Sequence, residues 1–192
     1  MSTSMVDNVT VAKTPLAGVM IIRNKRFHDS RGFFVESYSK EGLKQLGIDV
    51  EFVQDNLSFN INPFTIRGLH FQRAPFAQAK LVSVIKGSAL DVVVDLRRSS
   101  PTFGKHFKVV LNATDGDQLF VPAAFAHGYL THEPETLFSY KVAQPYSPEH
   151  EGGLCFDDSL LGIDWATRAD QIITSTKDRA WPAFDPGMSY FK

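Results

Sequence analysis

Short apolar runs separated by turn residues recur along the whole chain, and this spacing constrains the fold more than any other feature. Turn pairs such as Lys86-Gly87, Ser100-Pro101 and Asp115-Gly116 separate the runs. Strands are predicted at residues 18–23, 32–38, 66–72, 80–85, 90–96, 105–111, 117–121, 125–131 and 136–142. Many short strands at this spacing predict an antiparallel β-sandwich or barrel rather than βαβ units.

Helical signals are confined to two segments. Ser39 is a favourable N-cap for a short helix that ends at Leu46, before Gly47. A second helix is expected over residues 165–171, after the apolar residues 160–163. The 192 residues contain no internal repeat, low-complexity tract or long linker. We therefore expect residues 1–192 to form one mainly β domain with a few short helices.

Charge and cysteine content narrow the classes of partner. A formal net charge of -1 gives no electrostatic reason to expect nucleic acid or a membrane as the main partner. The N-terminal residues lack a basic region followed by an apolar run, so no signal peptide is expected. Apolar runs are too short for a membrane-spanning helix. The single cysteine, Cys155, cannot form an internal disulfide and is expected to be a packed thiol, which fits the cytoplasm.

Candidate chemistry begins with the segment Ile66-Arg-Gly-Leu-His-Phe-Gln72, which combines a base with a guanidinium that can bind anions. Lys80 opens a later strand, where an ammonium group can stabilise an oxyanion. His127 and Tyr140 lie on two further strands. The sequence contains neither a His-x-His metal pair nor a Gly-x-Ser-x-Gly nucleophile motif. These residues therefore favour acid–base chemistry without a metal.

Several segments, in order along the chain, resemble one known family. The matching stretches are residues 29–36, 52–56, 67–72, 77–82, 91–97, 100–104, 125–128 and 157–158. In this respect the chain is similar to the dTDP-4-dehydrorhamnose 3,5-epimerases of the cupin superfamily, from residue 18 to about residue 178. The resemblance implies a cupin jelly-roll antiparallel β-barrel that needs no metal or other cofactor. It also implies a homodimer in which one subunit lends N-terminal strands to its partner.

The substrate implied by the resemblance is a dTDP-linked 4-keto-6-deoxyhexose. Carbons 3 and 5 of this sugar flank the C4 ketone, so removal of either proton gives an enolate. In the family's pattern, His70 is the base and Asp178 orients it, while Tyr140 returns a proton from the opposite face. Lys80 stabilises the enolate oxygen and His127 anchors the sugar. Imidazole suits the role of base because its unperturbed pKa is about 6.5.

The resemblance also implies a set of substrate-binding residues. Arg31 and Arg67 are expected to contact the diphosphate, since a planar guanidinium matches phosphate oxygens. Residues 31–36 are expected to reach across the dimer, and Tyr146 to stack on thymine. The complete binding set is Arg31, Phe34, Glu36, Gln54, Asn56, Arg67, His127, Tyr146 and Glu151.

Some positions depart from the family's pattern. Ala79 replaces a Gly, Phe71 replaces a Tyr, and residues 122–124 read Pro-Ala-Ala instead of Pro-x-Gly. Pro145 stands where many members have an aromatic residue beside Tyr146, so the preference for thymidine is open. None of these changes removes a proposed catalytic group.

The separation of Arg67 and His70 makes a geometric prediction. The two residues are an odd number of positions apart, so a regular strand would point them to opposite faces. Both can face one pocket only if the strand is interrupted, and Gly68 is the expected site of a bulge.

Three alternatives remain open from the sequence. One is a mono-epimerase that inverts only C3 or C5. Another is a metal-dependent cupin, against which the missing ligand pairs argue. A third is a non-catalytic protein that binds sugar nucleotides, which would need neither a base nor an opposed acid.

Overall fold

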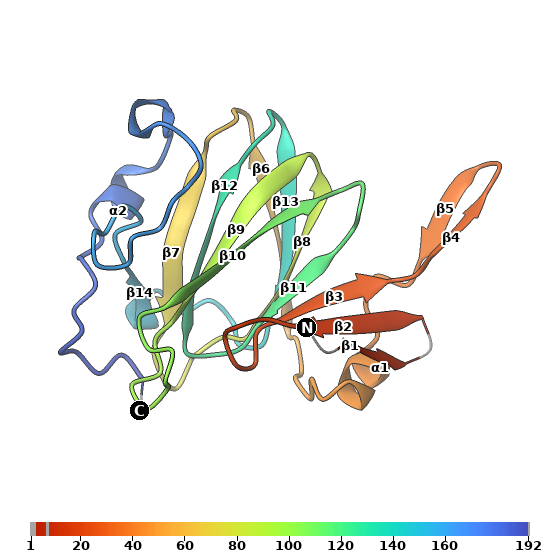
Figure 1. The fold of residues 1–192 in the computed structure, drawn as a ribbon, viewed down its shortest axis with the longest axis horizontal. Coiled ribbons are helices and arrows are strands. Elements are labelled where there is room, and N and C mark those ends of the chain that lie inside the picture. The colour runs from red at the N-terminus through yellow and green to blue at the C-terminus, as the bar shows by residue number, and fades with distance from the viewer. Residues whose placement is uncertain (1–2, 7, 192) are drawn as a thin grey trace.

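The chain folds into two antiparallel sheets that face each other, as seen in a computed structural model that describes residues 3–6 and 8–191 (Figure 1). The seven-stranded sheet has the order β1 (Thr3–Val6), β2 (Val9–Lys13), β3 (Met20–Asn24), β11 (Gln118–Val121), β8 (Lys80–Lys86), β13 (Thr136–Val142) and β6 (Gln54–Asn60). The five-stranded sheet has the order β10 (His106–Asn112), β9 (Ser88–Asp95), β12 (Phe125–Thr131), β7 (Ile66–Gln72) and β14 (Glu151–Gly153).

A separate two-stranded hairpin, β4 (Arg26–Asp29) and β5 (Gly32–Val35), projects away from the two sheets (Figure 1). The mainly β, cupin-like jelly roll expected from the sequence is confirmed. The barrel is open, because the pairings between named strands keep the two sheets separate. In the part of the chain that the structure describes, no helix is long and apolar enough to cross a membrane.

Strand β9 shows why parts of the sequence are apolar without alternation. All eight of its residues are buried. Ala89 and Val93 pack into the core between the two sheets. Val92 and Val94 pack on the opposite side, against the C-terminal segment around Trp165 and Phe184. A strand covered on both faces gains from apolar side chains at every position, so charged residues within it stand out.

The first predicted helix is confirmed as α1 (Lys40–Gln45). Ser39 caps it by accepting a hydrogen bond from the amide of Gly42, and Gly47 follows with a positive φ of 86°. A buried apolar cluster joins Leu43 and Ile48 to residues of β2, β3, β8 and β11, so this helix packs against a face of the seven-stranded sheet.

The helix predicted over residues 165–171 is wrong. Only a 3₁₀ turn, η2 (Ala169–Gln171), forms there. Trp165 is buried, and its indole nitrogen donates to the carbonyl of Phe156, while Ala166 takes a positive φ of 55°. Burial of the indole therefore fixes a non-helical backbone.

The remaining helical elements are short and lie near the C-terminal half. They are the 3₁₀ turn η1 (Pro148–His150) and the helix α2 (Thr176–Arg179). Ser175 caps α2 by accepting a hydrogen bond from the amide of Asp178. The strand predicted over residues 32–38 ends at Val35, and the sequence pattern missed β1, β2, β4, β6 and β14. Strand β6 was missed because its inward side chains are polar.

Candidate active site

A cavity of about 420 Å³ opens between the two sheets, a volume that suits a sugar-sized ligand. Its walls combine strands β6, β8 and β13 of one sheet with β7, β12 and β14 of the other, and α2 closes one side. The side chains around it are Leu57, Ser58, Arg67, His70, Lys80, His127, Tyr129, Phe138, Tyr140, Tyr146, Glu151, Ser175, Lys177 and Asp178. All four predicted catalytic residues therefore surround one cavity.

His70 and Asp178 form a hydrogen-bonded pair at this cavity. The imidazole Nε2 lies 2.7 Å from Oδ1 of Asp178, which α2 carries and which is almost fully buried. Burial works to raise the pKa of Asp178, but the hydrogen bond and charge of His70 outweigh it, helped by the amide of Gly68, and lower this pKa. The ionised carboxylate therefore accepts the Nε2 proton, which leaves Nδ1 as the ring nitrogen that can act as a base.

The predicted interruption of β7 is present at Gly68. Along β12, His127 pairs with His70, whereas Tyr129, only two residues further, pairs with Arg67. One extra residue on β7 therefore brings Arg67 and His70 to the same face. Gly68 has a φ of 134°, and a Cβ there would lie 2.5 Å from the Cα of Gly128. Only glycine fits this position.

Lys80 is a buried cation in the cavity wall. Its side chain enters from β8, and Nζ donates to the backbone carbonyl of His70 at 3.4 Å. Burial lowers the pKa of Lys80 to about 8, although the negative charges of Asp91 and Glu151 oppose that shift. The ammonium form is therefore present at neutral pH and is lost as the pH rises through about 8.

Tyr140 faces His70 from the other sheet. It lies on β13, where it pairs with Val82 of β8, whereas His70 lies on β7 of the five-stranded sheet. Burial raises the pKa of Tyr140 above its ordinary value, and the charge of Arg67 only partly offsets this. The phenol is therefore protonated at neutral pH, so an imidazole and a protonated phenol lie on walls formed by different sheets.

The rim of the cavity holds several of the predicted binding residues. The Tyr146 hydroxyl donates to Glu151 Oε2 at 2.9 Å, and Lys177 Nζ lies 2.5 Å from the same oxygen. The amide of Tyr146 donates to Gln54, whose own side-chain nitrogen donates to Asn56 at 2.8 Å. Gln54 and Asn56 thus border the Tyr146 side of the site.

Arg67 and His127 complete the predicted residues within reach of the cavity. The guanidinium Nε of Arg67 donates to Asn60 Oδ1 at 2.9 Å. His127 is buried and bound to Asp91 through Nε2.

Five predicted binding residues do not line the cavity of the same chain: Gln54 and Asn56 lie beside its rim, and the other three lie on or next to the β4–β5 hairpin. Arg31 lies in the β4–β5 hairpin, and its guanidinium pairs with Asp29 at 2.6 Å. Phe34 is 70% exposed on the same hairpin, and Glu36 follows it. The β4–β5 hairpin projects away from the two sheets (Figure 1).

Sequence reasoning missed several residues at or beside the site, among them Lys177, Tyr129, Ser58 and Asp91. Lys177 directly precedes Asp178, and Tyr129 donates to Ser58 Oγ at 2.9 Å in the cavity wall. Asp91 is fully buried within the apolar strand β9. A carboxylate between apolar residues in the middle of a fully buried strand was the available signal for Asp91.

Among residues 3–6 and 8–191, no group of three or more His, Cys, Asp and Glu side chains is placed to hold a metal ion. Independence of metal stays a prediction that needs a chelator to test it.

Comparison with known proteins identifies the family. The family model described as dTDP-4-dehydrorhamnose 3,5-epimerase matches residues 13–186. A dTDP-4-dehydrorhamnose 3,5-epimerase from Sinorhizobium fredii is 43% identical over 177 residues, which cover 92% of this chain and 90% of that protein. The fold and the pocket define a sugar-nucleotide epimerase of the cupin type. The chain belongs to the dTDP-4-dehydrorhamnose 3,5-epimerase family.

Solved structures agree with this assignment. The enzyme of that name from Bacillus anthracis, with TDP and PPi bound, has a TM-score of 0.89 and 43% identity, and the match covers 92% of this chain and 99% of that one. An epimerase from Legionella pneumophila in complex with dTDP-4-keto-L-rhamnose has a TM-score of 0.86 and 39% identity, covering 91% and 92% of the two chains.

Proposed function

We propose that this epimerase inverts C3 and C5 of dTDP-4-keto-6-deoxy-D-glucose and gives dTDP-4-keto-L-rhamnose. The observation that carries the proposal is the opposition of His70 and Tyr140 across one cavity, with Lys80 buried in its wall. Base, proton donor and cation are the three groups that an enolate mechanism requires.

His70 acts as the base in this mechanism. Its Nδ1 removes the proton from the carbon beside the C4 ketone, and the electron pair of the C–H bond moves into the enolate. Asp178, held at 2.7 Å from Nε2, stabilises the imidazolium that forms. An acid–base group placed in this way contributes about 10²–10⁴-fold to the rate.

Tyr140 and Lys80 complete the inversion. The Tyr140 phenol returns a proton to the carbon from the opposite face, which inverts the centre. The Lys80 ammonium group stabilises the negative charge on the C4 oxygen while the enolate exists. No electrons leave the sugar, so removal and return of the proton balance without an oxidant or reductant. Proton exchange with solvent then restores the neutral imidazole and the phenol before the second centre reacts.

Substrate binding is assigned to polar and charged side chains at the cavity. Arg67 and His127 are assigned to the diphosphate and the sugar, and Tyr146 is assigned to the thymine ring. Glu151 lies beside Tyr146 and Lys177, where it orients both side chains.

We also propose a homodimer in which the β4–β5 hairpin reaches the partner's cavity. Phe34 on the hairpin is 70% exposed, and Leu57 and Ile61 on and beside β6 are each 69% exposed. Such exposed apolar side chains favour a covered surface. A second copy would also bring Arg31 and Glu36 to a cavity that they do not reach in their own chain. Sedimentation velocity should give a dimer, and a monomer at micromolar concentration would contradict this assignment.

A cytoplasmic location is likewise a proposal, supported by the single cysteine and by the nucleotide-linked substrate class.

The reaction is tested by incubating the protein with dTDP-4-keto-6-deoxy-D-glucose in D₂O, with and without a chelator, and following the sugar by proton NMR. We expect deuterium at both C3 and C5, unchanged by the chelator. His70→Ala should lose the exchange. His132→Ala is the matched control, because His132 follows β12 and does not line the cavity.

Other outcomes separate the alternatives. Exchange at only one carbon would make the protein a mono-epimerase. Folded protein that exchanges neither carbon would contradict the proposed reaction and favour a binding protein. Activity abolished by the chelator would revive metal dependence.

A further inference from the structure

Asp91 is a fully buried carboxylate that the proposed mechanism does not yet use. It lies in the middle of β9, with 0% exposure. Its side chain shares the inward face of the strand with Ala89 and Val93, which pack between the two sheets. A carboxylate in such a position costs folding free energy unless specific partners compensate it.

Among the described residues, His127 is the only hydrogen-bond partner of the Asp91 side chain. Nε2 of the imidazole lies 2.9 Å from Oδ2 and 3.1 Å from Oδ1 of the carboxylate. Strand register explains the contact, because Asp91 pairs with Tyr129, and His127 is two residues away on the same face of β12. Both carboxylate oxygens approach one nitrogen, so Nε2 carries the proton and Nδ1 is left free as an acceptor.

Lys80 provides the second partner by charge. Burial lowers the pKa of Lys80, and the negative charges of Asp91 and Glu151 oppose this effect. Asp91 contributes more than Glu151. Lys80 in turn works to lower the pKa of Asp91, which burial raises. The buried carboxylate and the buried ammonium group therefore each favour the charged form of the other.

We propose that Asp91 is a positioning residue of this site: it fixes His127 with the proton on Nε2 and supplies the negative charge that keeps Lys80 in its ammonium form. The inference rests on the proposed function, because the ammonium group matters through the enolate that it stabilises. Asp91 acts through Lys80 and His127 and is not assigned a contact with the substrate.

Other charged groups also face Lys80, so their contributions must be separated. Asp91 on β9 and Glu151 on β14 are the negative charges, and Glu151 is already paired with Lys177 at 2.5 Å. The remaining titratable or charged side chains around the cavity are Arg67 and His70 on β7, His127 on β12, Tyr140 on β13, Tyr129 on β12, Tyr146, Lys177 and Asp178. Glu151 is paired with Lys177 and Asp178 is paired with His70, whereas the Asp91 side chain is hydrogen-bonded to His127.

The test uses Asp91→Asn, which keeps an oxygen acceptor for His127 and removes the charge. We expect the alkaline limb of the pH profile of kcat to move to lower pH by about one pH unit, because a nearby opposite charge shifts a pKa by about 1–3. This displacement lowers kcat roughly fivefold at pH 8, with little change at pH 6 or in KM.

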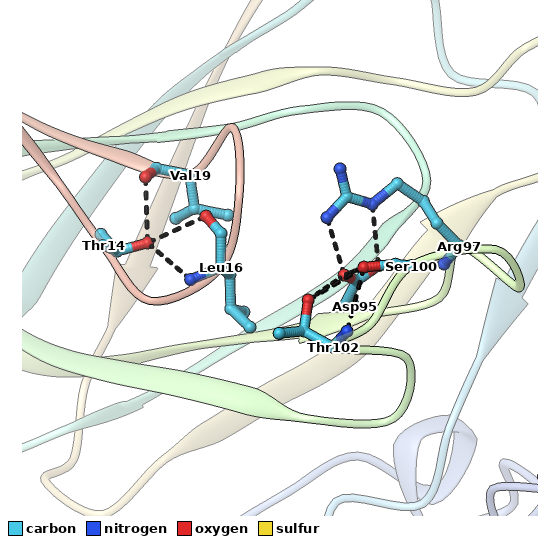
Figure 2. A network of polar contacts seen from close by, with 7 residues as sticks. All are labelled: Thr14, Leu16, Val19, Asp95, Arg97, Ser100 and Thr102. Carbon is cyan, nitrogen blue, oxygen red and sulfur yellow. Dashed lines mark hydrogen bonds and ion pairs between the residues drawn. The ribbon is translucent and has the colours of Figure 1, made fainter.

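Asp95→Asn is the matched control, since Asp95 lies on the same strand and the same face with the same 0% exposure. Its carboxylate is held by Arg97, Ser100 and Thr102 rather than by groups of the cavity (Figure 2). Asp95→Asn should keep the wild-type pH profile. An alkaline limb that coincides in Asp91→Asn and the wild type would overturn the inference.

A readout without substrate separates this inference from the proposed reaction. Lysines are labelled by reductive ¹³C-methylation, and the Lys80 signal is assigned by its absence in Lys80→Arg. Its NMR titration midpoint should be lower in Asp91→Asn than in the wild type, whether or not the sugar nucleotide reacts. Asp91→Ser provides a second neutral variant if Asp91→Asn does not fold. Equal midpoints in the wild type and the folded variant would contradict the role of Asp91.

Discussion

Two aspartates on one strand show how the same type of side chain can have two different roles in this molecule. Asp91 and Asp95 both lie on β9, both face inward and both have 0% exposure. Asp95 binds Arg97 at 2.7 Å, Ser100 at 2.6 Å and Thr102 at 2.6 Å in a closed network (Figure 2). The partners of Asp91 are one imidazole nitrogen of His127, by a hydrogen bond, and the ammonium group of Lys80, by charge.

The electrostatic outcomes are opposite. Burial works to raise the pKa of Asp95, but its hydrogen bonds from Arg97, Ser100 and Thr102 outweigh this and lower the pKa to about 2. Burial raises the pKa of Asp91, and His127 and Lys80 only partly offset the effect. Asp95 accepts hydrogen bonds from three side chains and Asp91 from one, and the carboxylate with more donors is the one whose pKa is lowered.

The difference separates a structural charge from a functional one. The donors around Asp95 hold the loop after β9 in place, so its charge contributes to folding. Asp91 has few hydrogen-bond donors, and its negative charge acts on Lys80 and His127. Its charge therefore contributes to the site. Three substitutions test this comparison, from the largest expected effect to the smallest.

Lys80→Met should have the largest effect, because it removes the cation on which Asp91 acts. We expect kcat to fall about 10²–10³-fold, which equals about 3–4 kcal/mol in the barrier, with KM little changed. Lys86→Met is the control on the same strand, since Lys86 is exposed and pairs only with Glu135. Steady-state kinetics measure both variants. A similar loss in both would refute the special role of Lys80.

Asp95→Asn should affect stability rather than activity. Lowering the Asp95 pKa from 3.8 to about 2 corresponds to about 2 kcal/mol of stability at pH 7. This contribution is present above the unfolded pKa near 4 and is lost as the pH falls through about 2. Urea unfolding at a fixed protein concentration should therefore show a difference from the wild type that narrows below about pH 4. A constant difference would show that packing, not charge, is lost.

Asp91→Asn should have the smallest effect on stability. The asparagine oxygen still accepts from His127, and removal of the charge relieves the effect of burial that raises the Asp91 pKa. We expect less than half of the loss in Asp95→Asn, measured by the same urea unfolding at pH 7. Equal losses of stability in the two variants would contradict the distinction between Asp91 and Asp95.

Much of the fold could be predicted from local pattern, because strands in a two-layer β-fold show apolar runs bounded by turns. Strand β6 escaped because it lies at a sheet edge, with polar side chains toward the cavity and apolar ones outward. The false helix at residues 165–171 had favourable local sequence, but tertiary burial of Trp165 overrode it. Helix α2 carried a capping signal in Ser175 and Asp178 that was not used for the helix.

The site was predictable only in part. The parity of Arg67 and His70 was enough to predict the bulge at Gly68, because the period of a strand is fixed at two. The roles of Lys80, Tyr140 and Asp178 came from family resemblance, and no local pattern brings these distant residues together. The importance of Asp91 depends on the register between β9 and β12, which the sequence does not specify.

The close contact between Gly68 and Gly128 has a consequence for how this enzyme can change by mutation. A Cβ on Gly68 would lie 2.5 Å from the Cα of Gly128, and a Cβ on Gly128 would lie 2.8 Å from the carbonyl oxygen of Arg67. Neither glycine can gain a side chain unless the facing strand moves. A single substitution at either position is therefore expected to disrupt the local pairing of β7 and β12. Variant libraries should retain both glycines in every active clone, and the spacing of Arg67 and His70 is inherited with them.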